Sequence, residues 1–198
     1  MFKVIEPYLL TFIAIFVAVD AIGNIPLFTS LVEGMNKRTK KMIVIDSVFT
    51  ATVLAILFTF LGKVVLRFIG ITVPDFQIAG GALLFIIASR LLLPAVAKGL
   101  ASRHDKEVGV FPLGTPLITG PAVLTTTLMM RDSYGLVPTL ISLLLNMLIV
   151  WFTLQKSELI IKVIGPGGSR AFAKIMYILL AAIGVMMVRK GIIGAFLK

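Results

Sequence analysis

Ionisable side chains are rare inside the long apolar segments of this chain, and those that occur there could bind or move charge. Only Asp20, Asp46, Asp75 and Arg90 fall within these segments. An ionisable residue at membrane depth is by default a candidate for a binding or relay site, because its charge is costly in lipid. Asp75 follows a proline at an expected helix start, where an acid is favoured, and Arg90 can reach the interface from a helix end. Asp20 and Asp46 therefore remain the candidates for ion coupling, although Asp46, about one turn inside its segment, could also simply reach the interface.

Asp20 stands at a sequence that should interrupt its apolar segment. Residues 20 to 26 read Asp-Ala-Ile-Gly-Asn-Ile-Pro. Proline clashes with the turn before it, glycine adds backbone freedom, and asparagine is favoured near a helix start. We therefore expect one half-helix to end near Asp20 and a second to start at about Pro26. Carbonyl groups freed at the end of the first half-helix would attract a cation or an ammonium group.

A second interruption lies in the other half of the chain, where residues 111 to 121 read Phe-Pro-Leu-Gly-Thr-Pro-Leu-Ile-Thr-Gly-Pro. Free N–H groups at the start of a half-helix attract anions such as a carboxylate. Broken helices at membrane depth are tolerated only where the backbone is buried in protein or lines a cavity. Two crossing breaks thus predict a pocket for a small zwitterion; the alternative is a pair of proline kinks that only shape packing. The predicted substrate-binding residues are Asp20, Gly23, Asn24, Pro26, Thr115, Thr119, Gly120 and Pro121.

The segments that carry these breaks are long enough to cross a bilayer. The chain has 198 residues, of which 59% are hydrophobic and 14% charged, against roughly 25% charged in soluble proteins. A helical span needs about 20 apolar residues. Six apolar blocks fill the chain, which predicts an all-α membrane protein with six transmembrane helices in a single domain, 1–198. The blocks are 7–32, 42–61 with an extension to 69, 74–93, 110–130, 137–154 with an extension to 164, and a short one at 175–188.

The second half of the chain repeats the first. A shift of 95 residues places Pro26 on Pro121, and a shift of 96 places Leu83-Leu84 on Leu179-Leu180. Each repeat, 1–98 and 107–198, has three blocks, an odd number, so the halves would lie in opposite orientations. This is the inverted-repeat architecture of many secondary transporters, with the first helix of each half, helices 1 and 4, discontinuous. Gly80 and Gly81 in the third block indicate close helix packing.

The distribution of basic residues predicts the orientation. The loops after the first, third and fifth blocks carry more Lys and Arg than the loops on the other side. Because cytoplasmic loops are enriched in Lys and Arg, both termini are expected outside the cytoplasm. The net charge of +10 is spread over these short loops and forms no aromatic-interleaved patch, which argues against nucleic-acid binding.

Composition also argues against enzymatic chemistry. There are no cysteines and one histidine, so thiolate sites and histidine clusters are excluded, and no H-E-x-x-H motif is present. We predict no catalytic residues, no cofactor and no metal. The expected partners are a small zwitterionic substrate and the lipid bilayer. The oligomeric state stays open, a homo-oligomer included.

Three motifs together resemble the MarC family, also described as small neutral amino-acid transporters. They are the segments 20–26 and 111–121 and the Ile-Ala-Gly-Gly-Ala-Leu-Leu sequence at 78–84. The resemblance covers essentially the whole chain and implies a six-helix plasma-membrane protein that transports glycine, alanine or serine. Ala21 and Ala122 stand where the family usually has proline and glycine. We expect a secondary transporter, with proton or sodium coupling open; the alternative is a small-solute channel or facilitator built on the same broken helices.

Overall fold

The computed structural model describes residues 2–92, 114 and 118–196, and every regular element in these ranges is helical. The all-α prediction is therefore confirmed for the described part of the chain. The helices are α1 (Phe2–Val19), α2 (Asn24–Leu31), α3 (Lys37–Ile69), α4 (Val73–Leu92), α6 (Pro121–Tyr134), α7 (Leu136–Gln155) and α8 (Ser157–Phe196).

The first apolar segment is broken, as its sequence predicts. Helix α1 ends at Val19, a turn follows, and α2 begins at Asn24, two residues before the expected start. Pro26 is thus the third residue of α2, within the first turn, where a proline removes no intrahelical hydrogen bond. The predicted break within the second half is described only on its downstream side, because most of 110–117 lies outside the described residues.

Local capping signals set the bounds of α3 and α4. The Asn36 side chain accepts a hydrogen bond from the Thr39 N–H at 2.8 Å at the start of α3. At its other end, α3 is capped by Gly70, whose φ of 80° is left-handed. At the start of α4, Asp75 Oδ2 accepts from the Thr72 N–H at 2.9 Å, and Thr72 Oγ1 accepts from the Asp75 N–H at 3.3 Å. This reciprocal cap confirms Asp75 as a helix-start acid.

The last two helices differ from the predicted bounds. Helix α7 ends at Gln155, and the expected extension to residue 164 belongs to the beginning of α8. Helix α8 bends at Gly165, which has a φ of 77°, and then continues to Phe196. The prediction of a short sixth helix over 175–188 is therefore wrong at its end. The reason is tertiary: Gly191 packs so closely on α4 that an added Cβ would lie 2.7 Å from the Pro74 carbonyl oxygen.

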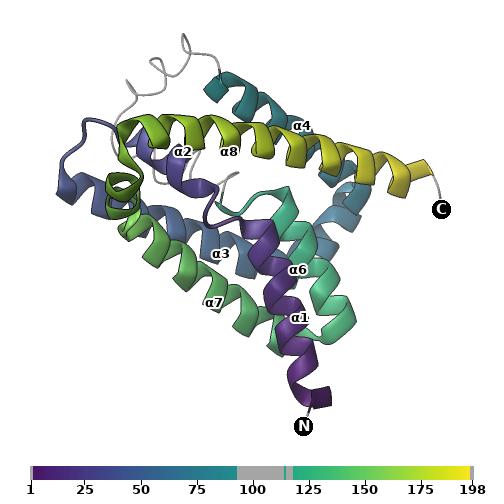
Figure 1. The fold of residues 1–198 in the computed structure, drawn as a ribbon. Helices are drawn as coiled ribbons and strands as arrows, with labels where there is room; N and C mark the ends of the chain where they lie inside the picture. Colours follow the sequence, from purple (N-terminus) through teal and green to yellow (C-terminus); the bar gives the residue numbers. More distant parts are fainter. Residues whose placement is uncertain (1, 93–113, 115–117, 197–198) are drawn as a thin grey trace.

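Helices α4 and α8 form a tight antiparallel pair along one side of the molecule (Figure 1). A Cβ on Gly81 would lie 2.5 Å from the Gly184 carbonyl oxygen, and a Cβ on Gly184 would lie 2.6 Å from the Gly81 carbonyl oxygen. A Cβ on Gly80 would lie 1.9 Å from Cγ of Pro121. The Gly80-Gly81 pair therefore serves close helix packing, as predicted, because only residues without a side chain allow these approaches.

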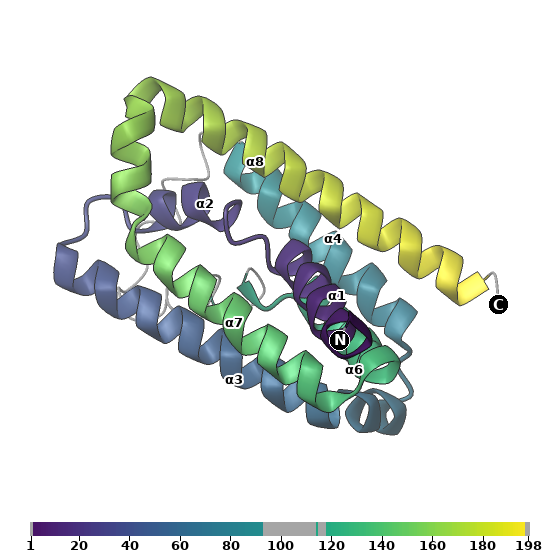
Figure 2. The same cartoon turned by 60° about the horizontal axis from the view of Figure 1, so that its bottom comes forward.

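The remaining helices form the other side of the bundle, where α7 runs alongside α3 (Figure 2) and α1 packs on both α6 and α7. Ser142 Oγ donates to the Tyr8 carbonyl and Asn146 Nδ2 donates to the Phe12 carbonyl, each at 3.2 Å. At one end of the bundle, the Arg131 guanidinium donates to the Thr59 carbonyl. These side-chain bonds to backbone carbonyls hold helix pairs together where apolar surroundings offer no other partner.

Four helices of the described chain are long and apolar enough to cross a membrane, and α1 contributes a shorter apolar stretch, Ile5–Val19. Their outward faces carry many exposed large apolar side chains, Phe49, Val64 and Phe68 among them. A protein in lipid exposes such faces to acyl chains rather than to water. The four candidate spans are Lys37–Ile69, Val73–Arg90, Leu136–Gln155 and Tyr177–Phe196.

Candidate functional site

The break between α1 and α2 is held by two side chains that bond across it. Asp20 Oδ1 accepts a hydrogen bond from the Gly23 N–H at 3.0 Å. Asn24 Nδ2 donates to the Val19 carbonyl at 2.9 Å and to the Asp20 carbonyl at 3.1 Å. The expectation of free carbonyl groups at the end of the first half-helix is thus wrong for these two, because buried backbone groups must find partners and Asn24 supplies one.

Asp20 keeps part of its binding capacity. Its φ of 46° is left-handed, a conformation that aspartate and asparagine tolerate better than other non-glycine residues. Among the described residues, its second carboxylate oxygen, Oδ2, has no hydrogen-bond partner. A Cβ on Gly23 would lie 2.1 Å from this oxygen. Glycine at position 23 therefore makes room for the carboxylate to fold over the break.

The second break presents a helix start without a side-chain cap. Gly120, with an extended backbone, precedes α6, Pro121 is the first residue of α6, and among the described residues no side chain bonds to the first backbone N–H groups. A helix start in this state carries a partial positive charge and favours an anionic group. Thr119, which is 1% exposed, donates its hydroxyl hydrogen to the Ala51 carbonyl of α3 at 2.9 Å and so anchors the break to that helix.

The two breaks meet at one small, largely enclosed cavity of about 30 Å³. That volume holds one or two water-sized groups. Its wall combines a carboxylate, an amide and the uncapped start of α6 with apolar side chains from α4 and α8. The lining residues are Ala18, Val19, Asp20, Gly23, Asn24, Leu27, Leu84, Gly120, Ala122, Val123, Leu180 and Ile183.

The structure brings together four of the predicted site residues and separates the others. Asp20, Gly23, Asn24 and Gly120 line the cavity. Three other predicted residues are described and do not line it. Pro26 lies in α2, Thr119 bonds to α3, Pro121 packs on Gly80, and Thr115 lies outside the described residues.

The second coupling candidate, Asp46, lies elsewhere. Its side chain is exposed on α3 and takes no part in the cavity. Among the two aspartates singled out by sequence, Asp20 alone therefore faces the place where the breaks meet. In the described part of the chain, no group of three or more His, Cys, Asp or Glu side chains is placed to hold a metal ion.

Sequence reasoning missed the apolar wall of the cavity, although the repeat offered a signal for it. Leu84 and Leu180 both line the cavity and are 96 residues apart, while Leu27 and Ala122 both line it and are 95 residues apart. These are the offsets that relate the two halves. Chemically, the cavity offers a carboxylate for a cationic group, a helix start for an anionic group, and apolar walls that limit size.

The chain matches known membrane proteins over nearly its whole length. The family profile described as MarC family integral membrane protein matches residues 5–196. A UPF0056 membrane protein of Methanocaldococcus jannaschii is 32% identical, over 96% of this chain and 88% of the relative. One from Archaeoglobus fulgidus is 30% identical, over 92% and 90%.

A bacterial relative extends the comparison. The UPF0056 inner membrane protein YhgN of Escherichia coli is 26% identical, over 87% of this chain and 89% of the relative. No solved structure matches the chain. With the apolar helices and both break motifs inside the matched range, the chain belongs to the MarC family of integral membrane proteins.

Proposed function

We propose that this protein is a secondary transporter of small neutral amino acids, of the glycine, alanine and serine class. The observation that carries the proposal is the cavity at which the two helix breaks meet, lined by Asp20 on one side and by the uncapped start of α6 on the other. A zwitterion needs an acceptor for its ammonium group and a donor for its carboxylate, a short distance apart. The cavity has one of each.

The substrate binds between these two groups in the proposed arrangement. Its carboxylate faces the first N–H groups of α6, and its ammonium group faces Oδ2 of Asp20. Asn24, which is 6% exposed, holds the break rigid, because its amide hydrogens bond to two carbonyls across it. The cavity of about 30 Å³ must widen to admit an amino acid, and the leucines at positions 84 and 180 in its wall favour the smallest side chains.

The proposed architecture has six transmembrane helices in two inverted repeats, 1–98 and 107–198. Contacts between elements support it. Helix α4 of the first repeat packs on α6 of the second, and the corresponding pair with the repeats exchanged, α8 and α2, is also in contact. Likewise α3 packs on α6, and α7 packs on α2. In alternating access, one repeat would rock against the other around the cavity.

Asp20 is the proposed coupling residue, through a proton or a sodium ion. Its carboxylate stands at the end of α1, where the helix dipole disfavours a negative charge and so favours a bound cation. The relative YhgN is named an inner membrane protein, and we assign this chain to the cell membrane, with both termini outside the cytoplasm. A channel or facilitator through the same breaks is the alternative, and accumulation of substrate against its gradient, which a channel cannot drive, separates the two.

Ligand-induced stabilisation of the purified protein tests the proposal. A ligand present at a hundred times its Kd stabilises the folded state by about 2.7 kcal/mol. We expect alanine to raise the melting temperature. Propionate, which lacks the ammonium group, and ethylamine, which lacks the carboxylate, should raise it little, because each loses one of the two contacts. Equal shifts with all three compounds, or no shift with glycine, alanine or serine, would contradict the proposed site.

A further inference from the structure

A second cavity lies at the end of the bundle where α3 begins and α7 meets α8. Its volume is about 200 Å³, several times that of the cavity at the breaks. Three lysines line it together with a glutamate, two further polar residues and an apolar wall. The lining residues are Phe28, Lys37, Lys40, Lys41, Val44, Leu154, Gln155, Ser157 and Glu158.

The charges around this cavity leave a positive excess. Lys40 Nζ bonds to Glu158 Oε1 at 2.8 Å. The hydrogen bond and the positive charge of Lys40, with a smaller effect of Lys37, hold the pKa of the Glu158 carboxyl below its ordinary value. In the part of the chain that the structure describes, neither Lys37 nor Lys41 has an ion-pair partner. Two lysines therefore face the cavity with their charge uncompensated.

Gln155 adds a neutral donor that lacks an acceptor. Its Nε2 atom is buried and, among the described residues, makes no hydrogen bond. A buried donor without a partner is unusual and indicates an acceptor that the described residues do not supply. The start of α3 also contributes the positive end of its dipole. An anion with several oxygen acceptors would satisfy the lysines and the amide together.

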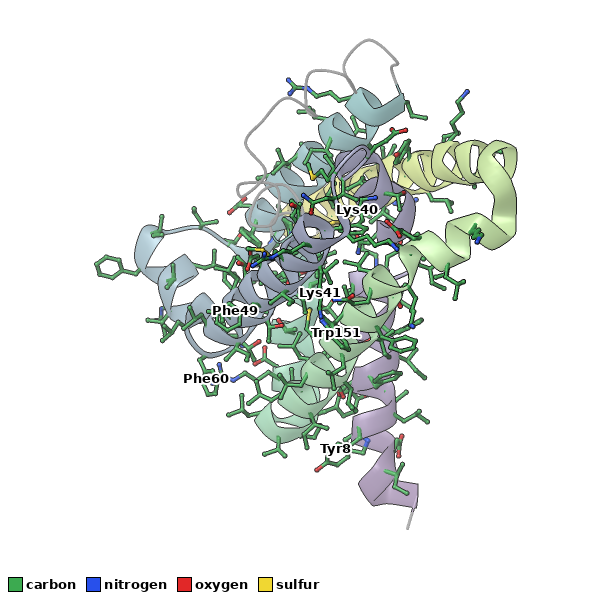
Figure 3. The ribbon with its side chains drawn as sticks, turned by 90° about the vertical axis from the view of Figure 1, so that its left-hand side faces the viewer. Tyr8, Lys40, Lys41, Phe49, Phe60 and Trp151 are labelled. Atoms are coloured by element: carbon green, nitrogen blue, oxygen red, sulfur yellow. The ribbon has the colours of Figure 1, made fainter. Side chains whose placement is uncertain are left out.

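The cavity sits at the level expected for lipid headgroups. It lies at the first residues of the candidate span Lys37–Ile69 and the last residues of Leu136–Gln155. Figure 3 places Lys40 and Lys41 toward one end of α3, with Phe49 and Phe60 farther along the helix. The loop after α2 belongs to the side with more Lys and Arg, which faces the cytoplasmic leaflet in the proposed topology.

We propose that this cavity binds the phosphate of an anionic phospholipid headgroup. The phosphate lies between Lys37 and Lys41 and accepts a hydrogen bond from Gln155 Nε2. The side chains of Phe28, Val44 and Leu154 provide the apolar wall on which the lipid's glycerol and upper acyl carbons pack. Basic pockets between helix ends on the cytoplasmic side are a recognised form of lipid site. The assignment does not depend on the transport proposal.

Lipid titration of the purified protein in neutral detergent tests this site, with melting temperature as the readout. The probes are short-chain phosphatidylglycerol, short-chain phosphatidylcholine and sodium phosphate. We expect phosphatidylglycerol to stabilise the protein at lower concentrations than the other two. The double variant Lys37→Gln/Lys41→Gln should weaken phosphatidylglycerol binding roughly 30-fold, since each lysine near an anionic headgroup contributes about fivefold in affinity.

Two further variants separate a built site from general charge attraction. Arg38→Gln/Arg67→Gln removes the same net charge from exposed positions that do not line the cavity, and it should bind phosphatidylglycerol almost as the wild type does. Gln155→Leu leaves the net charge unchanged and should weaken binding about tenfold. Equal binding by the lysine and arginine variants would overturn the proposal, as would unchanged binding by Gln155→Leu. Stabilisation by sodium phosphate as strong as by phosphatidylglycerol would overturn the assignment to a lipid.

Discussion

Asn24→Ala should destabilise the protein more than the loss of an ordinary helix cap. The Asn24 side chain is 6% exposed and donates to two carbonyls, those of Val19 and Asp20. After the substitution, the Asp20 carbonyl keeps the hydrogen bond from the Asn24 backbone N–H at 3.1 Å. The Val19 carbonyl loses the side-chain donor that stands in for the backbone N–H of a continuous helix. Val19 is only 2% exposed, so water does not replace this donor.

The size of the effect follows from these contacts. A buried acceptor left without a partner costs about 1–3 kcal/mol, and a second lost hydrogen bond adds about 1 kcal/mol. We therefore expect a loss of about 2–4 kcal/mol in the free energy of unfolding. Asn24→Asp should be worse, because it keeps the size but points an acceptor at two carbonyl oxygens.

The assay is reversible unfolding in mixed micelles, followed by circular dichroism. Asn36→Ala is the matched control, because Asn36 is an exposed cap with one hydrogen bond, to the Thr39 N–H at 2.8 Å. Loss of such a cap costs about 1 kcal/mol. If Asn24→Ala cost no more than Asn36→Ala, the bridging role of the Asn24 amide would be refuted.

Three further predictions concern packing, pH and topology. Gly184→Ala should lower stability by about 1–3 kcal/mol, because its Cβ would lie 2.6 Å from the Gly81 carbonyl oxygen and the helices must move apart. Gly194→Ala should cost less, because its Cβ would lie 3.2 Å from Pro74 Cγ. Equal melting temperatures for the two variants would contradict this. Because Lys40 lowers the pKa of Glu158 from 4.5, the pair should stabilise the fold above about pH 4.5 and lose this effect as pH falls through the lowered pKa. The effect should stay below about 1 kcal/mol, since both side chains are partly exposed, and Glu158→Gln should remove it from the pH dependence of melting between about pH 3 and 6. The chain has no cysteines, so a cysteine introduced at Thr72 should react with a membrane-impermeant maleimide in whole cells while one at Asn36 should not, and the reverse result would invert the topology.

Local signals in the sequence were sufficient for the first break and for the starts of α2, α4, α6 and α7 within two residues, whereas α1, α3 and α8 start earlier than predicted. Gly23, Asn24 and Pro26 influence only the backbone turn in which they lie, and the Thr72 and Asp75 cap does the same. The order of residues in the chain is therefore enough to predict these helix ends. The same holds for Gly120 and Pro121 at the start of α6. Such features depend on the preferences of residues next to each other in the chain, and the structure preserves them.

Features that depend on distant contacts could not be predicted from the same patterns. Helix α8 continues past residue 188 because Gly191 and Gly194 lie against Pro74 of α4, a contact that no local propensity indicates. The use of the Asn24 amide to bond to carbonyls of α1 depends on the turn geometry at Asp20. The polar contact of Thr119 with the Ala51 carbonyl joins residues far apart in the chain. The leucines of the cavity wall come from α2, α4 and α8, so their proximity depends on how these helices pack.

Concentrative uptake of labelled alanine into proteoliposomes tests the central claim most directly. With an inward proton or sodium gradient, the wild type should accumulate alanine above its external concentration, and collapse of the gradient should abolish the accumulation. Asp20→Asn keeps an acceptor for the Gly23 N–H and tolerates the left-handed φ of 46°, so this variant should fold but fail to accumulate alanine, whereas Asp46→Asn should transport normally. Equilibration without accumulation by the wild type, or gradient-driven accumulation by Asp20→Asn equal to that of the wild type, would contradict the account.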